Sequence, residues 1–340
     1  MLTNFINFAH RFHLKDHLMK EIVAPLPKEQ IIAELTPGKL LRKTNKGGNE
    51  IYVITHHDSP ALMHEIGRLR EFTFRDAGGG TGKETDIDKY DICESPYKQL
   101  IVWDPEAKEI LGGYRYILCS EAPVNEHGEV QMATSKLFHL SDTFIKEYLP
   151  HTLELGRSFV QPSYQSSKAG AKALFALDNL WDGLGALTVD HSEIDYFFGK
   201  VTMYSHFHSY ARNLIQYFFL KYFRDKTNLV YPKKPIEFDY NIDEMKAIFT
   251  GKNYREDYRI LVQKVRQYGE NVPPLINAYM NLSPSMKTFG TAMNEEFGSV
   301  LETGIIVTIK DIYEVKYDRH IETYIQDKKD RKSTRLNSSH

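Results

Sequence analysis

The chain of 340 residues has 43 lysines and arginines against 45 acidic residues, a net charge of −2 at pH 7. That balance excludes bulk nucleic-acid binding, which depends on a concentrated basic surface. Hydrophobic residues make up 41% of the chain, enough for a packed core, and no run reaches the 18 consecutive apolar residues of a membrane-spanning helix. Two cysteines exclude a disulfide scaffold, and no signal-peptide pattern is visible, so we expect a cytoplasmic protein.

The first part of the sequence predicts a helix, a strand, a second helix and a glycine-rich loop. Residues 1–35 have the spacing of an amphipathic helix. We expect it to pack on the main domain, and a membrane-surface helix is the alternative because basic residues accompany its apolar stripe. The β-branched run 51–55 predicts a strand, and Ser59 before Pro60 predicts the start of a helix that runs to about Phe74.

Strands and helices alternate through the middle of the chain. Strands are expected at 99–103, 110–119, 151–162 and 194–204, and helices at about 166–187 and 206–224. This succession favours a mixed α/β domain. Further along, 236–270 is expected to be mostly helical, and 272–282 and 303–309 to be strands.

No linker rich in glycine, serine or proline separates a second domain. We therefore predict an N-terminal amphipathic extension at 1–35, a single domain at 36–325 and a disordered tail at 326–340. The last ten residues are polar, serine-rich and unpatterned, so we interpret the tail as non-native sequence.

Several familiar motifs fail on inspection. The glycine-rich loop resembles a P-loop, but Ala77 and Glu84 stand where that motif needs glycine and Ser or Thr, so a mobile active-site loop is the better interpretation. His206 and His208 lack the further ligands of a zinc site and are expected to be capping or surface residues. No Gly-x-Ser-x-Gly elbow is present, and Cys119 lies in an apolar strand that favours an inert thiol.

The strand predicted at 151–162 contains an energetic anomaly. Glu154 and Arg157 interrupt an apolar run, although burying either charge costs several kcal/mol unless it is paired. In a regular strand, residues three apart point to opposite faces. A β-bulge would bring them to one face, and Gly156 between them is the residue type that tolerates one. An edge strand with two solvated charges is the alternative.

Other charged residues supply partners for this pair. Asp88 and Asp91 lie in one short acidic segment, and Arg115 lies within an apolar strand. Arginines in such strands need carboxylate partners. The set predicts either a catalytic constellation or a structural network of ion pairs, which also perturbs protonation.

Four segments resemble bacterial amino-acid lipid N-acyltransferases of the GNAT-like superfamily, which include ornithine-lipid, glycine-lipid and N-acylglycine synthases. They are Glu154–Val160, Leu180–Gly185, Tyr196–Val201 and Tyr210–Arg212, and the resemblance covers about residues 40–315. It implies an α/β fold of the α+β type, with a mixed, mostly antiparallel central sheet, a bulged and splayed strand, and flanking helices.

A more distant resemblance is to the acyl-homoserine lactone synthases. Their arginine helix, Asp-x-x-Asp loop, arginine strand and Glu-x-x-Arg strand are similar to Arg70–Phe74, Asp88–Asp91, Arg115 and Glu154–Arg157. The resemblance implies a long-chain acyl thioester donor, usually 3-hydroxyacyl, carried on acyl carrier protein.

One difference from GNAT enzymes that use coenzyme A supports acyl carrier protein as the donor. Those enzymes hold the pyrophosphate at a glycine-rich turn before a helix, and here Lys168 replaces the first glycine of that turn. We expect Lys168 and Lys172 to meet the acidic surface of the carrier protein. No metal or redox cofactor is implied.

The resemblance assigns expected roles. Glu154 is the expected base for the acceptor ammonium, and a backbone N–H near Ser158 and Phe159 is the expected oxyanion donor. Arg115 and Arg157 are expected to pair with carboxylates or hold the acceptor carboxylate. The other expected substrate-binding residues are Arg70, Phe74, Asp88, Asp91, Lys168 and Arg212.

The acceptor is expected to be a small amino acid, glycine in preference to ornithine. An acyl-homoserine lactone synthase that uses S-adenosylmethionine is one alternative. A non-catalytic module that binds lipid or acyl carrier protein is another, because fold does not imply function. Peripheral membrane contact is a further possibility, through the N-terminal helix or through the aromatic residues 217–223. The alternative for those aromatic residues is a position in the core.

Overall fold

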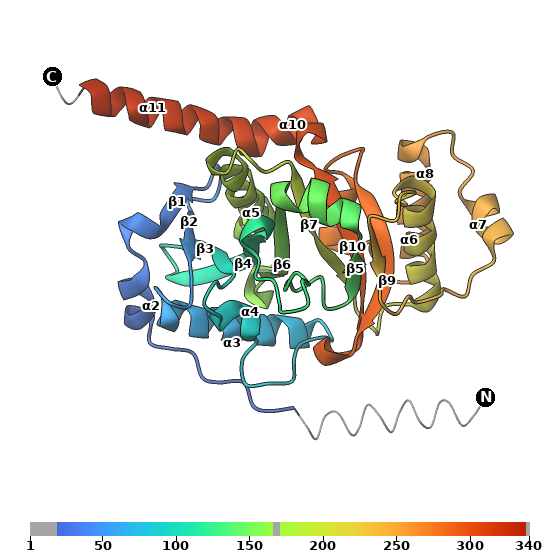
Figure 1. The fold of residues 1–340 in the computed structure, drawn as a ribbon, viewed down its shortest axis with the longest axis horizontal. Coiled ribbons are helices and arrows are strands. Elements are labelled where there is room, and N and C mark those ends of the chain that lie inside the picture. The colour runs from blue at the N-terminus through green and yellow to red at the C-terminus, as the bar shows by residue number, and fades with distance from the viewer. Residues whose placement is uncertain (1–18, 166–170, 338–340) are drawn as a thin grey trace.

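A large mixed sheet organises the computed structural model, which describes residues 19–165 and 171–337 (Figure 1). Its strand order is β1-β2-β3-β4-β6-β7-β10-β9. The strands are β1 (Leu40–Lys43), β2 (Glu50–Ile54), β3 (Lys98–Asp104), β4 (Glu109–Leu118), β6 (Thr152–Val160), β7 (Tyr196–Met203), β9 (Lys287–Asn294) and β10 (Val300–Thr308). All neighbours are antiparallel except β6 and β7. The mixed, mostly antiparallel sheet implied by the family resemblance is confirmed.

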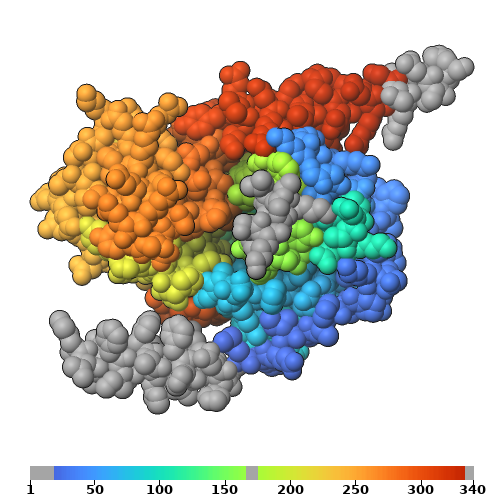
Figure 2. All heavy atoms as spheres, turned by 180° about the vertical axis from the view of Figure 1, so that it is seen from behind, coloured from blue at the N-terminus to red at the C-terminus, as the bar shows by residue number. Residues whose placement is uncertain are grey.

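Helices cover both faces and one end of the sheet. They are α2 (Lys28–Glu34), α3 (Pro60–Asp76), α4 (Lys89–Ile92), α5 (Ala171–Asp190), α6 (Ser209–Tyr222), α7 (Ile242–Ile248), α8 (Tyr254–Arg266), α9 (Pro274–Met280), α10 (Glu314–Tyr317) and α11 (Thr323–Asn337). A small second sheet pairs β5 (Phe138–Leu140) with β8 (Val230–Pro232). Figure 2 shows the blue N-terminal part and the orange segment around α8 at opposite ends, with α5 between them.

Alternate side chains of the strands pack into two separate hydrophobic cores. On β3, Leu100 and Val102 join the core cluster that includes α5 and α6, whereas Ile101 and Trp103 join the cluster that includes α3. Because successive strand side chains point to opposite faces, α3 and α5 cover opposite faces of the sheet. Any opening through the sheet therefore connects these two sides.

The sheet opens between β6 and β7. Their parallel pairing runs from Thr152 opposite Tyr196 to Leu155 opposite Gly199, and there it ends although both strands continue. Beyond that point, the backbone groups of β6 that face β7 have no ladder partner in β7. The splayed strand expected from the resemblance is confirmed here.

The bulge in β6 is also confirmed, but with a different residue at its centre. The register with β4 shifts between the pairs Arg115–Gly156 and Gly113–Phe159, so Tyr114 faces two residues of β6. Arg157 takes the left-handed conformation with φ of 48°, whereas Gly156 has no positive φ. Gly156 was expected to permit the bulge, but the residue in the left-handed conformation is Arg157, whose ion pairs described below hold a conformation that costs about 1–2 kcal/mol.

Two further expectations from the sequence were wrong. Residues 274–280 form helix α9, with Pro274 at its first turn where a missing N–H costs nothing, and the strand lies later, at β9. The predicted disordered tail is helical to Asn337 in α11. Residues 338–340 lie outside the described residues.

Two predictions concerned membrane contact, by the helix expected at 1–35 and by the aromatic residues 217–223, and their outcomes differ. Most of the predicted helix 1–35 lies outside the described residues, and within 19–35 the helix is α2. The aromatic residues considered above for membrane contact belong to the core instead, because each is less than a tenth exposed. They are Tyr217, Phe218, Phe219 and Phe223. In the described ranges, none of the helices has the length and hydropathy required to span a membrane.

The close approach of β6 and β7 leads to a stability prediction. A Cβ on Gly199 would lie 2.4 Å from the Leu155 carbonyl oxygen, so Gly199→Ala should lower the free energy of unfolding by about 1–3 kcal/mol. Gly38→Ala is the matched control, because a Cβ there meets nothing within 4 Å. Urea unfolding of both variants tests this, and equal stabilities would contradict the tight pairing.

Candidate active site

A cavity of about 1450 Å³ lies where β6 and β7 separate. Typical ligand pockets occupy roughly 300–1,000 Å³, so this one has room for two substrates. One part is polar and is lined from the α3 side by Asp88, Tyr90, Arg115, Arg157, Lys200 and Glu302. The other part is apolar and is lined from the α5 side by Leu155, Leu177, Phe197, Leu275, Tyr279 and Ile305.

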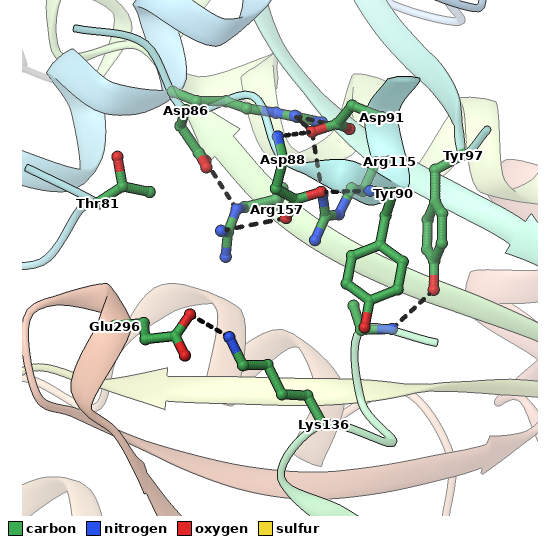
Figure 3. Close-up of polar contacts among 12 residues, drawn as sticks. Thr81, Asp86, Asp88, Tyr90, Asp91, Tyr97, Arg115, Lys136, Arg157 and Glu296 are labelled. Atoms are coloured by element: carbon green, nitrogen blue, oxygen red, sulfur yellow. Dashed lines mark hydrogen bonds and ion pairs between the residues drawn. The ribbon is translucent and has the colours of Figure 1, made fainter. Parts of the chain in front are cut away.

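Three arginines and three aspartates form a charge-balanced network above the polar part (Figure 3). Asp91 contacts Arg70 at 3.2 Å and Arg115 at 3.1 Å, and Arg115 also contacts Asp88 at 2.8 Å. Arg157 lies 2.7 Å from Asp86 and 3.8 Å from Asp88, and its guanidinium stacks 4.1 Å above the ring of Phe297. Each buried charge therefore has an opposite neighbour.

The Asp-x-x-Asp segment also builds its own local structure. The Asp88 side chain accepts a hydrogen bond from the Tyr90 N–H, and the Asp91 side chain accepts one from the Asp88 N–H. This reciprocal capping starts helix α4. It fixes both carboxylates toward Arg115.

The network shifts the pKa values of its members strongly. Burial would raise the pKa of Asp91, but the adjacent Arg70 and Arg115 guanidinium groups outweigh it and hold that pKa well below its usual value. Burial would likewise lower the pKa of Arg115, and the three aspartates around it raise it well above its usual value. Both groups are charged at neutral pH.

Glu154 lies behind the cavity wall. It is 1% exposed, and one carboxylate oxygen accepts the Thr134 N–H at 2.7 Å while the other accepts the Tyr97 hydroxyl. The Tyr97 oxygen in turn accepts the Ala133 N–H at 3.0 Å. In the described part of the chain, the residues that line the cavity do not include Glu154.

The glycine-rich loop forms part of the cavity wall. The buried Glu71 carboxylate accepts the N–H groups of Thr81 at 3.0 Å and Gly82 at 2.7 Å. Gly78, Gly80 and Gly82 all have positive φ, which explains the glycine spacing. Thr81 lines the cavity.

Comparisons with known proteins identify the chain. Residues 69–174 match the family described as "Acetyltransferase (GNAT) domain". A glycine N(alpha)-acyltransferase of Phocaeicola vulgatus is 56% identical over 308 residues, which cover 91% of this chain and 94% of that protein. The chain belongs to the GNAT N-acyltransferases.

Two further similarities were found. A glycine N(alpha)-acyltransferase of Bacteroides thetaiotaomicron is also 56% identical, over 91% of both chains. A solved CoA-dependent acyl-homoserine lactone synthase, BjaI, with SAM and isopentyl-CoA, aligns with 12% identity and a TM-score of 0.34, over 80% of this chain and 89% of that one.

In this N-acyltransferase, the predicted site residues fall into four groups. Those that line the cavity are Phe74, Asp88, Arg115, Arg157, Ser158 and Phe159. Arg70, Asp91 and Glu154 are buried behind it. Arg212 lies on α6, outside the cavity lining in the described ranges, and Lys168 lies outside the described residues.

Two residues that sequence reasoning missed also line the cavity of the N-acyltransferase. Lys200 on β7 and Glu302 on β10 face it, 3.6 Å apart. The signal that singled out Glu154, a charge within an apolar strand, is present at both positions. By contrast, His208 caps α6 by accepting the Tyr210 N–H, and burial raises the pKa of the Cys119 thiol well above its usual value.

The buried network leads to a prediction for stability and pH. Asp91→Asn leaves two buried arginines short of a carboxylate and should cost about 3–5 kcal/mol of unfolding free energy at pH 7. Because folding depresses the pKa of Asp91, its stabilisation is present above the unfolded value of about 3.9 and is lost as the pH falls through the folded value. The difference in unfolding free energy between the wild type and the variant should therefore become smaller below about pH 4.

Urea unfolding from pH 3 to 7 measures this gap. Asp243→Asn is the control, because that carboxylate is exposed in its ion pair with Lys246 and should contribute less than about 1 kcal/mol. A pH-independent gap, or a loss at Asp91 no larger than at Asp243, would contradict the account of the network.

Proposed function

We propose that this N-acyltransferase moves a long-chain fatty acyl group, 3-hydroxylated in its usual form, from acyl carrier protein to the α-amine of glycine. The product is an N-acylglycine. The acceptor is supported by the two relatives named glycine N(alpha)-acyltransferase. The observation that carries the proposal is the continuity of the cavity, whose polar part suits an amino acid and whose apolar part suits an acyl chain.

The thioester would lie at the splay of β6 and β7. Its pantetheine arm would follow the backbone of β6 beyond Leu155, where β7 no longer pairs with it. A backbone N–H near Ser158 or Phe159, both on the cavity wall, would stabilise the oxyanion of the tetrahedral intermediate. The acyl chain would then extend toward Leu177 and Tyr279 on the α5 side.

The basic residues of the polar part would orient the acceptor. Arg115 and Arg157 line the cavity but already face aspartates, so their charges are balanced within the network and they would act as hydrogen-bond donors on this wall. The role of Glu154 as base stays a prediction. Its carboxylate is separated from the cavity by the Ala133–Thr134 segment, so it would act through intervening groups.

Incubation with defined donors and acceptors tests the proposal. The purified enzyme should form N-acylglycine from 3-hydroxyacyl carrier protein and glycine, detected by mass spectrometry, at least tenfold faster than from the same acyl group on coenzyme A. Ornithine should react more slowly than glycine. Lactone formation from S-adenosylmethionine, or tight binding of the acyl carrier protein with no product, would overturn the proposal.

The donor surface leads to a separate prediction. If Lys168 and Lys172 contact an acidic carrier protein, Lys168→Glu together with Lys172→Glu should raise the KM for acyl carrier protein about tenfold or more, because like charges now meet across the interface. The KM for glycine should not change. Reversal of the exposed Lys226 and Lys252 is the charge-matched control, and equal effects of the two double variants would exclude a specific docking site.

A further inference from the structure

We propose that Glu302 binds the ammonium group of the amino-acid acceptor and accepts its proton. This inference rests on the proposed function, because it assigns the acceptor end of the same cavity. It places the base on β10, on the opposite side of the splay from Glu154, and so replaces the expectation that Glu154 is the base.

Glu302 is a buried carboxylate with unused hydrogen-bonding capacity. It is 4% exposed, and its Oε2 atom has no hydrogen-bond partner among the described residues. Buried carboxylate oxygens are normally satisfied, and an unsatisfied one is costly. A cationic ligand donor would remove that cost, and Glu302 lines the cavity that would hold such a ligand.

The other acidic residues on the cavity wall are already engaged or solvated. In the described ranges these are Asp88, Glu129 and Glu296. Asp88 pairs with Arg115 and caps α4, Glu129 accepts the Asn125 amide at an exposed turn, and Glu296 pairs with Lys136 at the surface (Figure 3). Glu302 is the member of this set that combines burial with an unfilled acceptor.

The neighbour of Glu302 suits the other end of an amino acid. Lys200 Nζ lies 3.6 Å from Glu302 Oε2, beyond hydrogen-bond distance. It is held by the Ala133 carbonyl oxygen at 3.3 Å and the Thr134 hydroxyl at 3.4 Å. A zwitterionic acceptor can align its ammonium with Glu302 and its carboxylate with Lys200, so that both charges are matched.

Glu154 connects to this pair as a positioning residue. Its two oxygens hold Thr134 directly and Ala133 through Tyr97. Those two residues hold Lys200. A chain of contacts thus runs from the Glu-x-x-Arg strand to the cavity, without Glu154 reaching the acceptor.

The proposed reaction is a direct aminolysis of the thioester. Glu302 takes one proton from the ammonium, and the freed lone pair attacks the thioester carbon, so that a C–N bond forms. The tetrahedral intermediate expels the thiolate as the C–S bond breaks, and the thiolate takes the second nitrogen proton. N-acyl amino acid and free thiol leave, and Glu302 returns its proton to solvent.

Three variants of Glu302 and its surroundings test the proposal. Glu302→Gln keeps the shape but removes the base, and kcat with glycine should fall about 100-fold or more, with the KM for the acyl donor unchanged. Glu302→Asp keeps a carboxylate and should retain more activity than the glutamine variant. Glu295→Gln, an exposed site on the neighbouring turn, should match the wild type.

A purely steric role for Glu302 predicts the reverse order, because glutamine preserves packing better than aspartate. Turnover of Glu302→Gln within about threefold of wild type, or an aspartate variant weaker than the glutamine variant, would overturn the inference. Thermal unfolding of each variant confirms that the folded enzyme is compared. If the wild type forms no N-acylglycine, the proposed function fails; if it does and Glu302→Gln is active, only this inference fails.

Discussion

The short parallel pairing of β6 and β7 determines how the rest of the molecule works. Four residue pairs, from Thr152 opposite Tyr196 to Leu155 opposite Gly199, hold the two halves of the sheet together. Beyond them the strands separate, and the cavity follows that separation from one face of the sheet to the other. Had the ladder continued, the polar and apolar parts would be divided by a closed sheet, and the reacting groups of two substrates could not meet.

The second constraint is the cost of burying charge beside this opening. Six charged residues above the polar part neutralise one another, from Arg70 in α3 to Asp91 in α4 and Arg115 in β4. The same network holds Arg157 in its left-handed conformation at the bulge. Because the bulge shifts the register with β4, the ion pairs and the shape of the splayed strand depend on each other.

The sequence predicted much of this arrangement because buried charges in apolar strands are recognisable without coordinates. Glu154, Arg157 and Arg115 stood out in that way, and the structure brings all three to one region of the sheet. The conformation at the bulge could not be read from residue type, since Arg157 rather than Gly156 carries the positive φ. The partners that impose it, Asp86 and Asp88, are distant in sequence.

Other features needed the three-dimensional structure. The apolar run 272–282 suits a strand or a helix equally well by periodicity, and the prolines at its start decide for a helix. Lys200 and Glu302 become a pair only when β7 and β10 lie side by side. Whether Glu154 reaches the cavity depends on the Ala133–Thr134 segment, which has no sequence signature.

A crystal structure of the enzyme with bound N-acylglycine would show directly whether both substrates meet where β6 and β7 separate. We expect the amide of the product at the splay beside Ser158, the acyl chain directed toward Leu177 and Tyr279, and the glycine carboxylate within hydrogen-bond distance of Lys200. An acyl chain on the α3 side of the sheet, or a product bound outside the splay, would contradict it.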